Sequence, residues 1–302
     1  MKRILLIATG GTIACRETAQ GLAPVLDGAA LLAQLPDLAQ VCEAGVCELM
    51  QLDSTDLTAA DRMAMARAVW ARRADWDGFV LAHGTDTLAY TAALLRHVLP
   101  HIDRPVVLTG SMLPMGAPDS DAPRNLLDAF RVAASGRAGV WAAVCGRIIS
   151  GGHVYKRHST AADAFVSVGA PQAGEIGADG RVSWDLPPQA AGQPALVEPR
   201  GPHAPVLRLT PDLDPAVLAA LGGCPAVILE TFGAGGVPGR LEDALRALIR
   251  GGTRVYLASQ CLEGGVDLHK YAVGRRAEAL GAVSLGARTV EDALAAILCG
   301  EL

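Results

Sequence analysis

Short runs of aliphatic and β-branched residues, alternating with helical patterns, constrain the fold of this chain more than any other feature. In the first half, four such runs end in glycine or polar residues and lie at 4–8, 78–82, 106–109 and 140–144. Such runs are typical of strands buried on both faces. Helical patterns separate them, at about 58–73, 87–99 and 123–134. This alternation predicts an α/β fold with a parallel sheet, whose site lies beyond the carboxyl ends of its strands.

A proline-rich stretch then interrupts the pattern. Six prolines fall among Gly and Ala between residues 184 and 205, which is a composition typical of a linker. The alternation resumes with strands near 226–230 and 254–258 and helices near 215–221, 240–250 and 290–298. We therefore predict a larger N-terminal domain with a parallel sheet at 1–185, a linker at 186–205, and a smaller α/β C-terminal domain at 206–302.

Composition excludes several classes of protein. The 302 residues are 51% hydrophobic and carry a net charge of -5 without long basic runs, so we expect a globular core and no nucleic-acid partner. The apolar run after Lys2-Arg3 is too short for a signal peptide, and no stretch is long enough to cross a bilayer. We expect a soluble, cytoplasmic protein with no membrane partner. Seven cysteines without paired CxxC spacing indicate reduced thiols, most of them small core residues.

The first predicted strand runs directly into the loop Thr9-Gly10-Gly11-Thr12-Ile13-Ala14. Thr12 therefore lies at the carboxyl end of a strand, and the two glycines before it permit close approach of the backbone. This is a suitable position for a nucleophile. A phosphate-binding turn or a plain tight turn is the alternative, but neither the GxGxxG nor the GxxxxGK[ST] spacing is present.

A second strand end repeats this geometry in His83-Gly84-Thr85-Asp86-Thr87, immediately ahead of a predicted helix. Thr85 and Asp86 are residue types that also cap helices, so capping alone is the simpler interpretation of either one. Two strand ends that each carry Gly-Thr, one of them with a carboxylate, could however hold a hydroxyl nucleophile beside a cationic group of a substrate.

Two further loops follow predicted strands in the same way. Asp53-Ser54-Thr55-Asp56 offers hydroxyls and backbone N–H groups to a carboxylate, and Thr109-Gly110-Ser111 follows the strand at 106–109. The alternative interpretation of the loop at 53–56 is that it only caps a helix. Because the carboxyl ends of parallel strands meet at one edge of a sheet, we expect all four loops to converge there.

Lys156 is the only lysine of the predicted N-terminal domain apart from Lys2, in a sequence that otherwise uses arginine. A desolvated lysine can lose its proton and act as a base, whereas arginine cannot; a solvated surface lysine is the alternative. His97 and His101 have the spacing of a helical metal pair, but Pro100 lies between them and no third ligand is suitably spaced. We interpret them as surface residues at a helix end and predict no metal. The absence of GxSxG disfavours a serine hydrolase.

Taken together, four motifs closely resemble the bacterial asparaginase/glutaminase family in sequence, order and spacing. They are TGGTIA at 9–14, DSTD at 53–56, HGTDTLAYTA at 83–92 and TGSMLP at 109–114. Lys156, in KRHSTAADAF, lies where that family carries its catalytic lysine, and ASQC at 258–261 with HKY at 269–271 resembles its C-terminal domain. The resemblance spans essentially the whole chain and points to the cytoplasmic type.

The resemblance implies a hydrolase of L-asparagine without metal or organic cofactor. Thr12 and Thr85 would be the two catalytic threonines, and Asp86 and Lys156 would complete a triad with Thr85. Ser54 and Asp86 would hold the α-carboxylate and α-amino groups, and Ser111 would offer its backbone carbonyl to the leaving amide. The predicted substrate-binding set is completed by Asp53, Thr55, Gly11 and Gly84. The smaller domain would complete the site of a neighbouring subunit, in a homodimer or homotetramer.

This sequence departs from the family pattern at three places. Leu22 stands where many relatives carry a catalytic-loop tyrosine, and Thr55 replaces a glutamine of the periplasmic type. Gly265 and either Ala234 or Gly236 stand where the second subunit of some relatives supplies a glutamate or asparagine, for which Glu263 could substitute. The alternatives are a glutaminase or broader amidase, including the asparaginase-like subunit of a tRNA-dependent amidotransferase, and a catalytically silent protein that binds amino acids.

Overall fold

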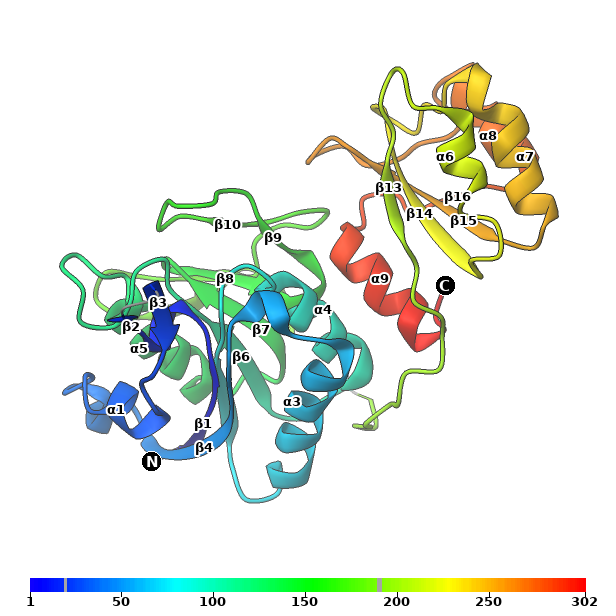
Figure 1. The fold of residues 1–302 in the computed structure, drawn as a ribbon. Helices are drawn as coiled ribbons and strands as arrows, with labels where there is room; N and C mark the ends of the chain where they lie inside the picture. Colours follow the sequence, from blue (N-terminus) through cyan, green and yellow to red (C-terminus); the bar gives the residue numbers. More distant parts are fainter. Residues whose placement is uncertain (19–20, 189–191) are drawn as a thin grey trace. The chain divides into compact units, whose positions relative to one another are not determined.

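The computed structural model describes the backbone of residues 1–18, 21–188 and 192–302 and divides into two compact units (Figure 1). Unit 1 comprises Met1–Ser167 and Pro171–Glu198, and unit 2 comprises Val168–Ala170 and Pro199–Leu302. The main break, between Glu198 and Pro199, falls inside the proline-rich stretch.

Unit 1 is built around an eight-stranded sheet of order β12-β11-β8-β7-β6-β5-β1-β4. Five neighbouring strands are parallel, as the sequence predicted: β4 (Glu43–Leu52), β1 (Arg3–Gly10), β5 (Gly78–Ala82), β6 (Pro105–Thr109) and β7 (Gly139–Val144). The sheet then continues with three antiparallel strands that the sequence pattern did not reveal: β8 (Arg147–Ser150), β11 (Gly174–Ile176) and β12 (Val182–Trp184). Runs of three or four residues are too short to show a strand period.

Helices cover both faces of the parallel strands, which explains why β5, β6 and β7 are buried at every position. On one face α5 (Ala122–Ala134) packs with α1 (Gly28–Leu32) and α2 (Leu38–Val41). On the other face lie α3 (Ala59–Arg72) and α4 (Leu88–Val98) (Figure 1). Phe130 of α5, fully buried, contacts a core that includes Val80, Val107 and Trp141.

Two hairpins and two short 3-10 helices lie near the carboxyl ends of these strands. The hairpins pair β2 (Cys15–Thr18) with β3 (Gly21–Pro24), and β9 (Val154–Lys156) with β10 (Phe165–Ser167). These 3-10 helices are η1 (Thr12–Ala14) and η2 (Ser54–Asp56); another, η3 (Gly151–His153), follows β8 and packs against α4. Lys156 thus sits at the end of a strand and pairs with Phe165 across the hairpin.

Residues 195–198, within the proline-rich stretch, are hydrogen-bonded to α3 and to the C-terminal end of α4. The Glu198 carboxylate accepts two hydrogen bonds from Arg67 of α3, at 3.0 and 2.7 Å. The backbone N–H groups of Val197 and Ala195 donate to the carbonyls of Val98 and Pro100, at 2.8 and 3.2 Å. Residues 195–198 therefore lie against Arg67, inside α3, and the C-terminal end of α4.

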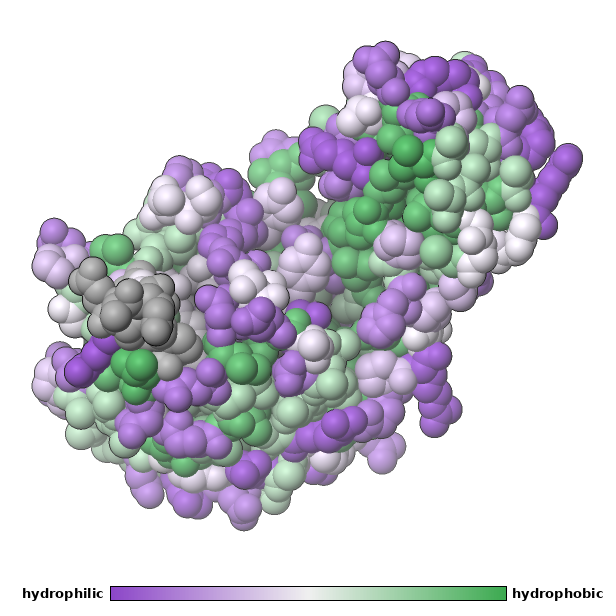
Figure 2. Space-filling model, viewed as in Figure 1, coloured by the Kyte–Doolittle hydropathy of each residue, from purple (hydrophilic) through white to green (hydrophobic). Residues whose placement is uncertain are grey.

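Unit 2 has a four-stranded parallel sheet of order β13 (Val206–Arg208), β14 (Ala226–Thr231), β15 (Arg254–Ser259) and β16 (Val283–Ser284). Its helices are α6 (Pro215–Ala219), α7 (Glu242–Arg250), α8 (Ala272–Leu280) and α9 (Val290–Cys299), with the 3-10 helix η4 (Gly239–Leu241) before α7. Two separate apolar clusters fill the two faces of the sheet, and α9 contributes to only one of them. On the face that Figure 2 shows, apolar residues gather over β13 and β14, where Val206 of the three-residue edge strand is 40% exposed. Such a short edge limits pairing with other chains.

Two interpretations of individual residues were wrong. His97 is buried, not on the surface, because α4 is covered at nearly every position; His101 is exposed. All seven cysteines are free, but only Cys15 and Cys42 are buried, so the expectation that most lie in the core fails. Within residues 1–18, 21–188 and 192–302, no helix is long and apolar enough for a membrane span, and no group of His, Cys, Asp and Glu side chains could hold a metal.

Candidate active site

The loops that follow β1 and β5 are in direct contact at the carboxyl edge of the sheet. A Cβ atom added to Gly11 would come within 2.2 Å of the Gly84 nitrogen, a distance that no side chain can occupy. Gly11 also has φ of +76°, which favours glycine. The two glycines therefore let the backbones meet, and they bring Thr12 and Thr85, the next residue in each loop, to one place.

The loop after β4 joins this contact through Ser54. Ser54 is 3% exposed, and a Cβ atom on Gly84 would lie 2.5 Å from its Oγ. Thr87 donates its hydroxyl proton to the Ser54 carbonyl at 2.7 Å, which links η2 to the start of α4. Asp53 and Thr55 are exposed instead, and the Asp53 carboxylate accepts bonds from the Thr55 N–H and hydroxyl, both at 2.8 Å. Of Asp53, Ser54 and Thr55, all predicted to bind substrate, Ser54 is the one that packs against Gly84.

Lys156 joins the two polar residues that follow Gly84. Its Nζ donates to Thr85 Oγ1 at 2.8 Å and to Asp86 Oδ1 at 2.6 Å. The Lys156 side chain is 14% exposed, Thr85 is 5% exposed, and the Asp86 side chain is 61% exposed. The amine is thus held at the edge of the solvent, with a hydroxyl on one side and a carboxylate on the other. The surface-lysine alternative does not fit this geometry.

Thr12 opens η1 and is half-buried. In the part of the chain that the structure describes, its hydroxyl has no hydrogen-bond partner, so nothing there competes with a substrate for it. The backbone of Leu22 belongs to β3, but its side chain lies outside the described residues.

His83 is a structural residue of the site that sequence reasoning did not single out. Its ring is fully buried, with Nδ1 2.6 Å from the Gly84 carbonyl and Nε2 2.9 Å from Thr91 Oγ1. Burial lowers the pKa of His83 to about 4, because the charged ring would be desolvated. A neutral ring that donates from Nδ1 and accepts from Thr91 satisfies both contacts. The sequence signal for His83 was its position as the first residue of the HGTDT motif.

The loop after β6 packs against the same motif. A Cβ atom on Gly110 would lie 2.4 Å from the His83 carbonyl oxygen and 3.2 Å from Thr85 Cγ2. Ser111 is fully buried, and its hydroxyl donates to the Leu113 carbonyl at 2.6 Å. The structure therefore brings Gly11, Ser54, Gly84, Thr85 and Gly110 into contact around one point.

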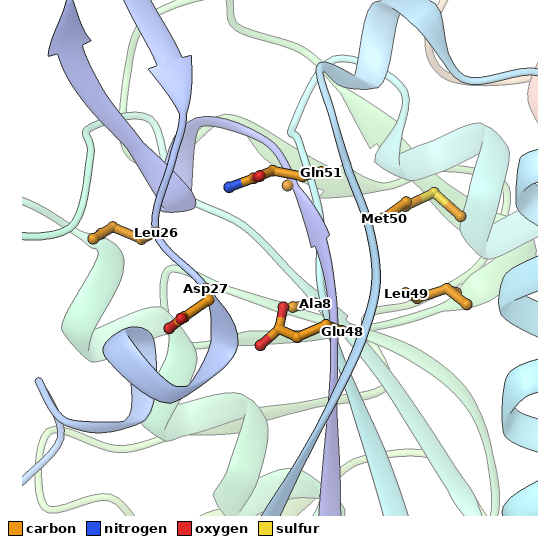
Figure 3. A pocket seen from close by; sticks show the side chains of 8 residues that line it. Ala8, Leu26, Asp27, Glu48, Leu49, Met50 and Gln51 are labelled. Atoms are coloured by element: carbon orange, nitrogen blue, oxygen red, sulfur yellow. The ribbon is translucent and has the colours of Figure 1, made fainter.

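A cavity of about 360 Å³ lies beside this site, between β1, β4 and the chain that leads into α1 (Figure 3). Its two carboxylates are engaged: Asp27 caps α1 through the Ala30 N–H, and Glu48 accepts the Gly28 N–H. None of the predicted catalytic residues lines it, so we assign no chemistry to it.

The residues predicted to contribute from the smaller domain lie at strand ends of unit 2. Ala234 and Gly236 follow β14, where Phe232 and Gly236 form an isolated bridge. Glu263 is exposed in the loop after β15, near Gly265. Their roles remain predictions.

Comparison with known proteins agrees with this arrangement. Residues 3–190 match the family model "Asparaginase, N-terminal", and residues 204–299 match "Glutaminase/Asparaginase C-terminal domain". An L-asparaginase of Thermococcus kodakarensis is 36% identical over 98% of this chain and 92% of its own length. L-asparaginase 1 of Escherichia coli is 33% identical over 97% of this chain and 90% of its own.

Solved structures give the same result. The thermostable L-asparaginase from Thermococcus kodakarensis has a TM-score of 0.91 at 36% identity, and the match covers 99% of this chain and 92% of that one. A structure titled a probable cytoplasmic L-asparaginase, from Campylobacter jejuni, has a TM-score of 0.85 at 25% identity over 100% and 95% of the two chains. The family models, the relatives and the fold agree, and this chain belongs to the asparaginase/glutaminase family.

Proposed function

We propose that this protein is an L-asparaginase, which hydrolyses the side-chain amide of L-asparagine to L-aspartate and ammonia. The observation that carries the proposal is Lys156, whose Nζ bonds both Thr85 Oγ1 and Asp86 Oδ1 beside the buried Ser54. Relatives named L-asparaginase, similar over nearly their whole length, support the choice of substrate.

In this mechanism a threonine hydroxyl attacks the amide carbon, the C–N bond breaks, and the nitrogen leaves as ammonia with the proton that the threonine gave up. Water then attacks the acyl-enzyme and releases aspartate and the free threonine hydroxyl. A hydroxyl is a weak nucleophile and needs a base. Lys156 donates to Thr85 Oγ1 and is held by Asp86; once deprotonated it would accept the proton of Thr85, and Thr12 lies in the adjoining loop. Ser54 and Asp86 would hold the substrate's α-carboxylate and α-amino groups, and backbone N–H groups beside Gly11 and Gly84 would stabilise the oxyanion.

We also propose a cytoplasmic homodimer or homotetramer. The support for the location is a similar structure whose title calls that protein cytoplasmic. Light scattering on the purified protein tests the assembly, and a monomer at assay concentration would contradict it.

An ammonia-release assay with L-asparagine, L-glutamine and D-asparagine tests the activity directly. We expect turnover of L-asparagine and none above background for Lys156→Met, which keeps the volume of the side chain but removes its amine. A chain that binds aspartate without releasing ammonia from any of the three amides would be the silent binding protein. Faster turnover of glutamine would make it a glutaminase.

A further inference from the structure

Asp121 stands at the N-cap of α5, yet its side chain makes no capping bond. Aspartate is a preferred cap, so its carboxylate is used elsewhere. It accepts the backbone N–H of Met112 at 3.1 and 3.0 Å and that of Leu113 at 3.0 Å. The Asp121 carboxylate therefore holds the loop after β6 in place.

Asn125, one turn further along α5, holds the same loop at its other end. This residue is 1% exposed and is the only asparagine in the sequence. Its Nδ2 donates to the Gly110 carbonyl at 2.9 Å and to Asp121 Oδ2 at 3.0 Å. Its Oδ1 accepts the Cys145 N–H at 2.9 Å, from the turn between β7 and β8. All its polar positions are fixed, which makes it a rigid support.

These bonds fix the two peptide groups on either side of Ser111. All peptide bonds are trans, so the N–H and C=O of one peptide point in opposite directions. Because the Gly110 carbonyl points to Asn125, the Ser111 N–H points away from it. Because the Met112 N–H points to Asp121, the Ser111 carbonyl points away from that carboxylate. Both main-chain groups of Ser111 are thus turned from α5.

The main-chain groups of Ser111 are buried and unpaired. Ser111 is 0% exposed, and across the described ranges neither its N–H nor its C=O has a hydrogen-bond partner. Buried backbone groups are nearly always paired, so an exception at this place calls for a ligand or water. A Cβ atom on Gly110, one residue earlier, would lie 2.4 Å from the His83 carbonyl oxygen and 3.2 Å from the Thr85 methyl, so Ser111 directly follows the contact with the 83–85 loop.

We propose that Asp121 and Asn125 are positioning residues that aim the Ser111 backbone carbonyl at the N–H of the substrate's leaving amide. The inference rests on the proposed asparaginase activity. Neither side chain touches the substrate; each acts through a peptide group of the 110–113 loop. Their contribution is therefore confined to substrates whose leaving group carries an N–H.

The test compares amide with ester hydrolysis. L-aspartic acid β-methyl ester has the same α-groups and carbonyl as asparagine, but its leaving methoxy group has no N–H to donate. Asp121→Asn and Asn125→Asp keep the side-chain shapes while disrupting these bonds. We expect kcat/KM for asparagine to fall about tenfold or more, as for misplaced catalytic groups generally, and ester hydrolysis to change less than about threefold. The binding of aspartate, by calorimetry, should be unchanged.

Asp214→Asn is the matched control, because Asp214 caps α6 in unit 2 through the Ala216 N–H and lies outside the loop. It should leave both rates unchanged. If the Asn125→Asp variant does not fold, the comparison of amide with ester hydrolysis by Asp121→Asn alone tests the proposal. Equal losses for amide and ester, or no loss for either, would overturn the positioning role. A wild-type protein without activity on asparagine would instead overturn the proposed function.

Discussion

The two threonines of the site are held differently. Thr85 is buried and bonded to Lys156, whereas the Thr12 hydroxyl has no partner among the described residues. If both act in one relay, Thr12→Ala and Thr85→Val should each lower kcat by at least about 100-fold, which is the typical contribution of acid–base catalysis. The double variant should be scarcely slower than either single one, because residues that act as a unit are not additive.

Ammonia-release kinetics on the three variants test this relay, with circular dichroism to confirm that each folds. Near-wild-type kcat in either single variant contradicts the two-threonine mechanism. Multiplicative losses in the double variant would mean that the hydroxyls act independently.

Lys156 offers a test of proton transfer against simple charge pairing. Lys156→Arg keeps the positive charge beside Asp86 but cannot accept a proton at usable pH, and Lys156→Met removes both properties. We expect both variants to be inactive in a steady-state assay from pH 6 to about 10, a range well below the pKa of arginine. An active arginine variant would reduce Lys156 to an electrostatic partner of Asp86.

At residue scale, the residue types that are rarest in this sequence mark two important positions, Lys156 and Asn125. Lys156 stood out because the predicted N-terminal domain has one other lysine, and the structure places it against Thr85 and Asp86. Asn125 is the single asparagine but follows no strand end, so it belongs to none of the motifs at the strand ends. Its importance depends on hydrogen bonds to residues 15 and 20 positions away, which no local pattern encodes.

At the scale of elements, the strands that are buried on both faces are the ones whose bounds can be predicted from the sequence. The strands β5, β6 and β7 are apolar throughout because helices cover both faces, and their predicted bounds agree with the observed ones to within one residue. The hairpin strands β9 and β10 have three residues each and mixed exposure, so their pairing depends on the rest of the fold. The approach of Lys156 to Thr85 arises from that hairpin and could be predicted only through family resemblance.

Helix α9 carries a carboxyl group whose burial should make stability depend on pH. Burial, with the nearby charges of Glu230 and Asp292, raises the pKa of Glu291, and its Oε2 has no partner among the described residues. A raised folded pKa means that the native state favours the protonated form. The stabilising contribution is complete below the unfolded pKa, about 4.3, and is lost as pH rises through the folded pKa.

We therefore expect Glu291→Gln to raise the melting temperature by a few degrees at pH 8, with the difference disappearing near pH 4. Differential scanning fluorimetry across this range measures the effect. Asp212→Asn, which removes a charge from an exposed position of unit 2, serves as the control and should show no such pH dependence. A destabilised Glu291→Gln variant at pH 8 would contradict the assignment.

For the whole molecule, the convergence of loops from β1, β4, β5 and β6 would fix the distance from the groups proposed to hold the substrate to the proposed threonine nucleophile. Ser54 and Gly11 both pack against Gly84, so these loops have little freedom to shift relative to one another. We expect kcat/KM for asparagine to exceed that for glutamine by roughly 10–200-fold, the usual discrimination of one methylene. Equal or faster hydrolysis of glutamine, in the same ammonia assay, would contradict this geometry.

The single asparagine also determines how this protein ages. Asparagine is among the thermolabile residues, since its side-chain amide is lost when the next backbone nitrogen attacks it. Here that chemistry has one target, Asn125, and the helical backbone of α5 holds the Leu126 nitrogen in place. Stored protein should therefore remain homogeneous in charge for long periods. When deamidation does occur, the cyclic imide opens to isoaspartate or aspartate. Neither product keeps the Nδ2 that donates to Gly110, so an aged sample should lose amide hydrolysis while it still cleaves the ester.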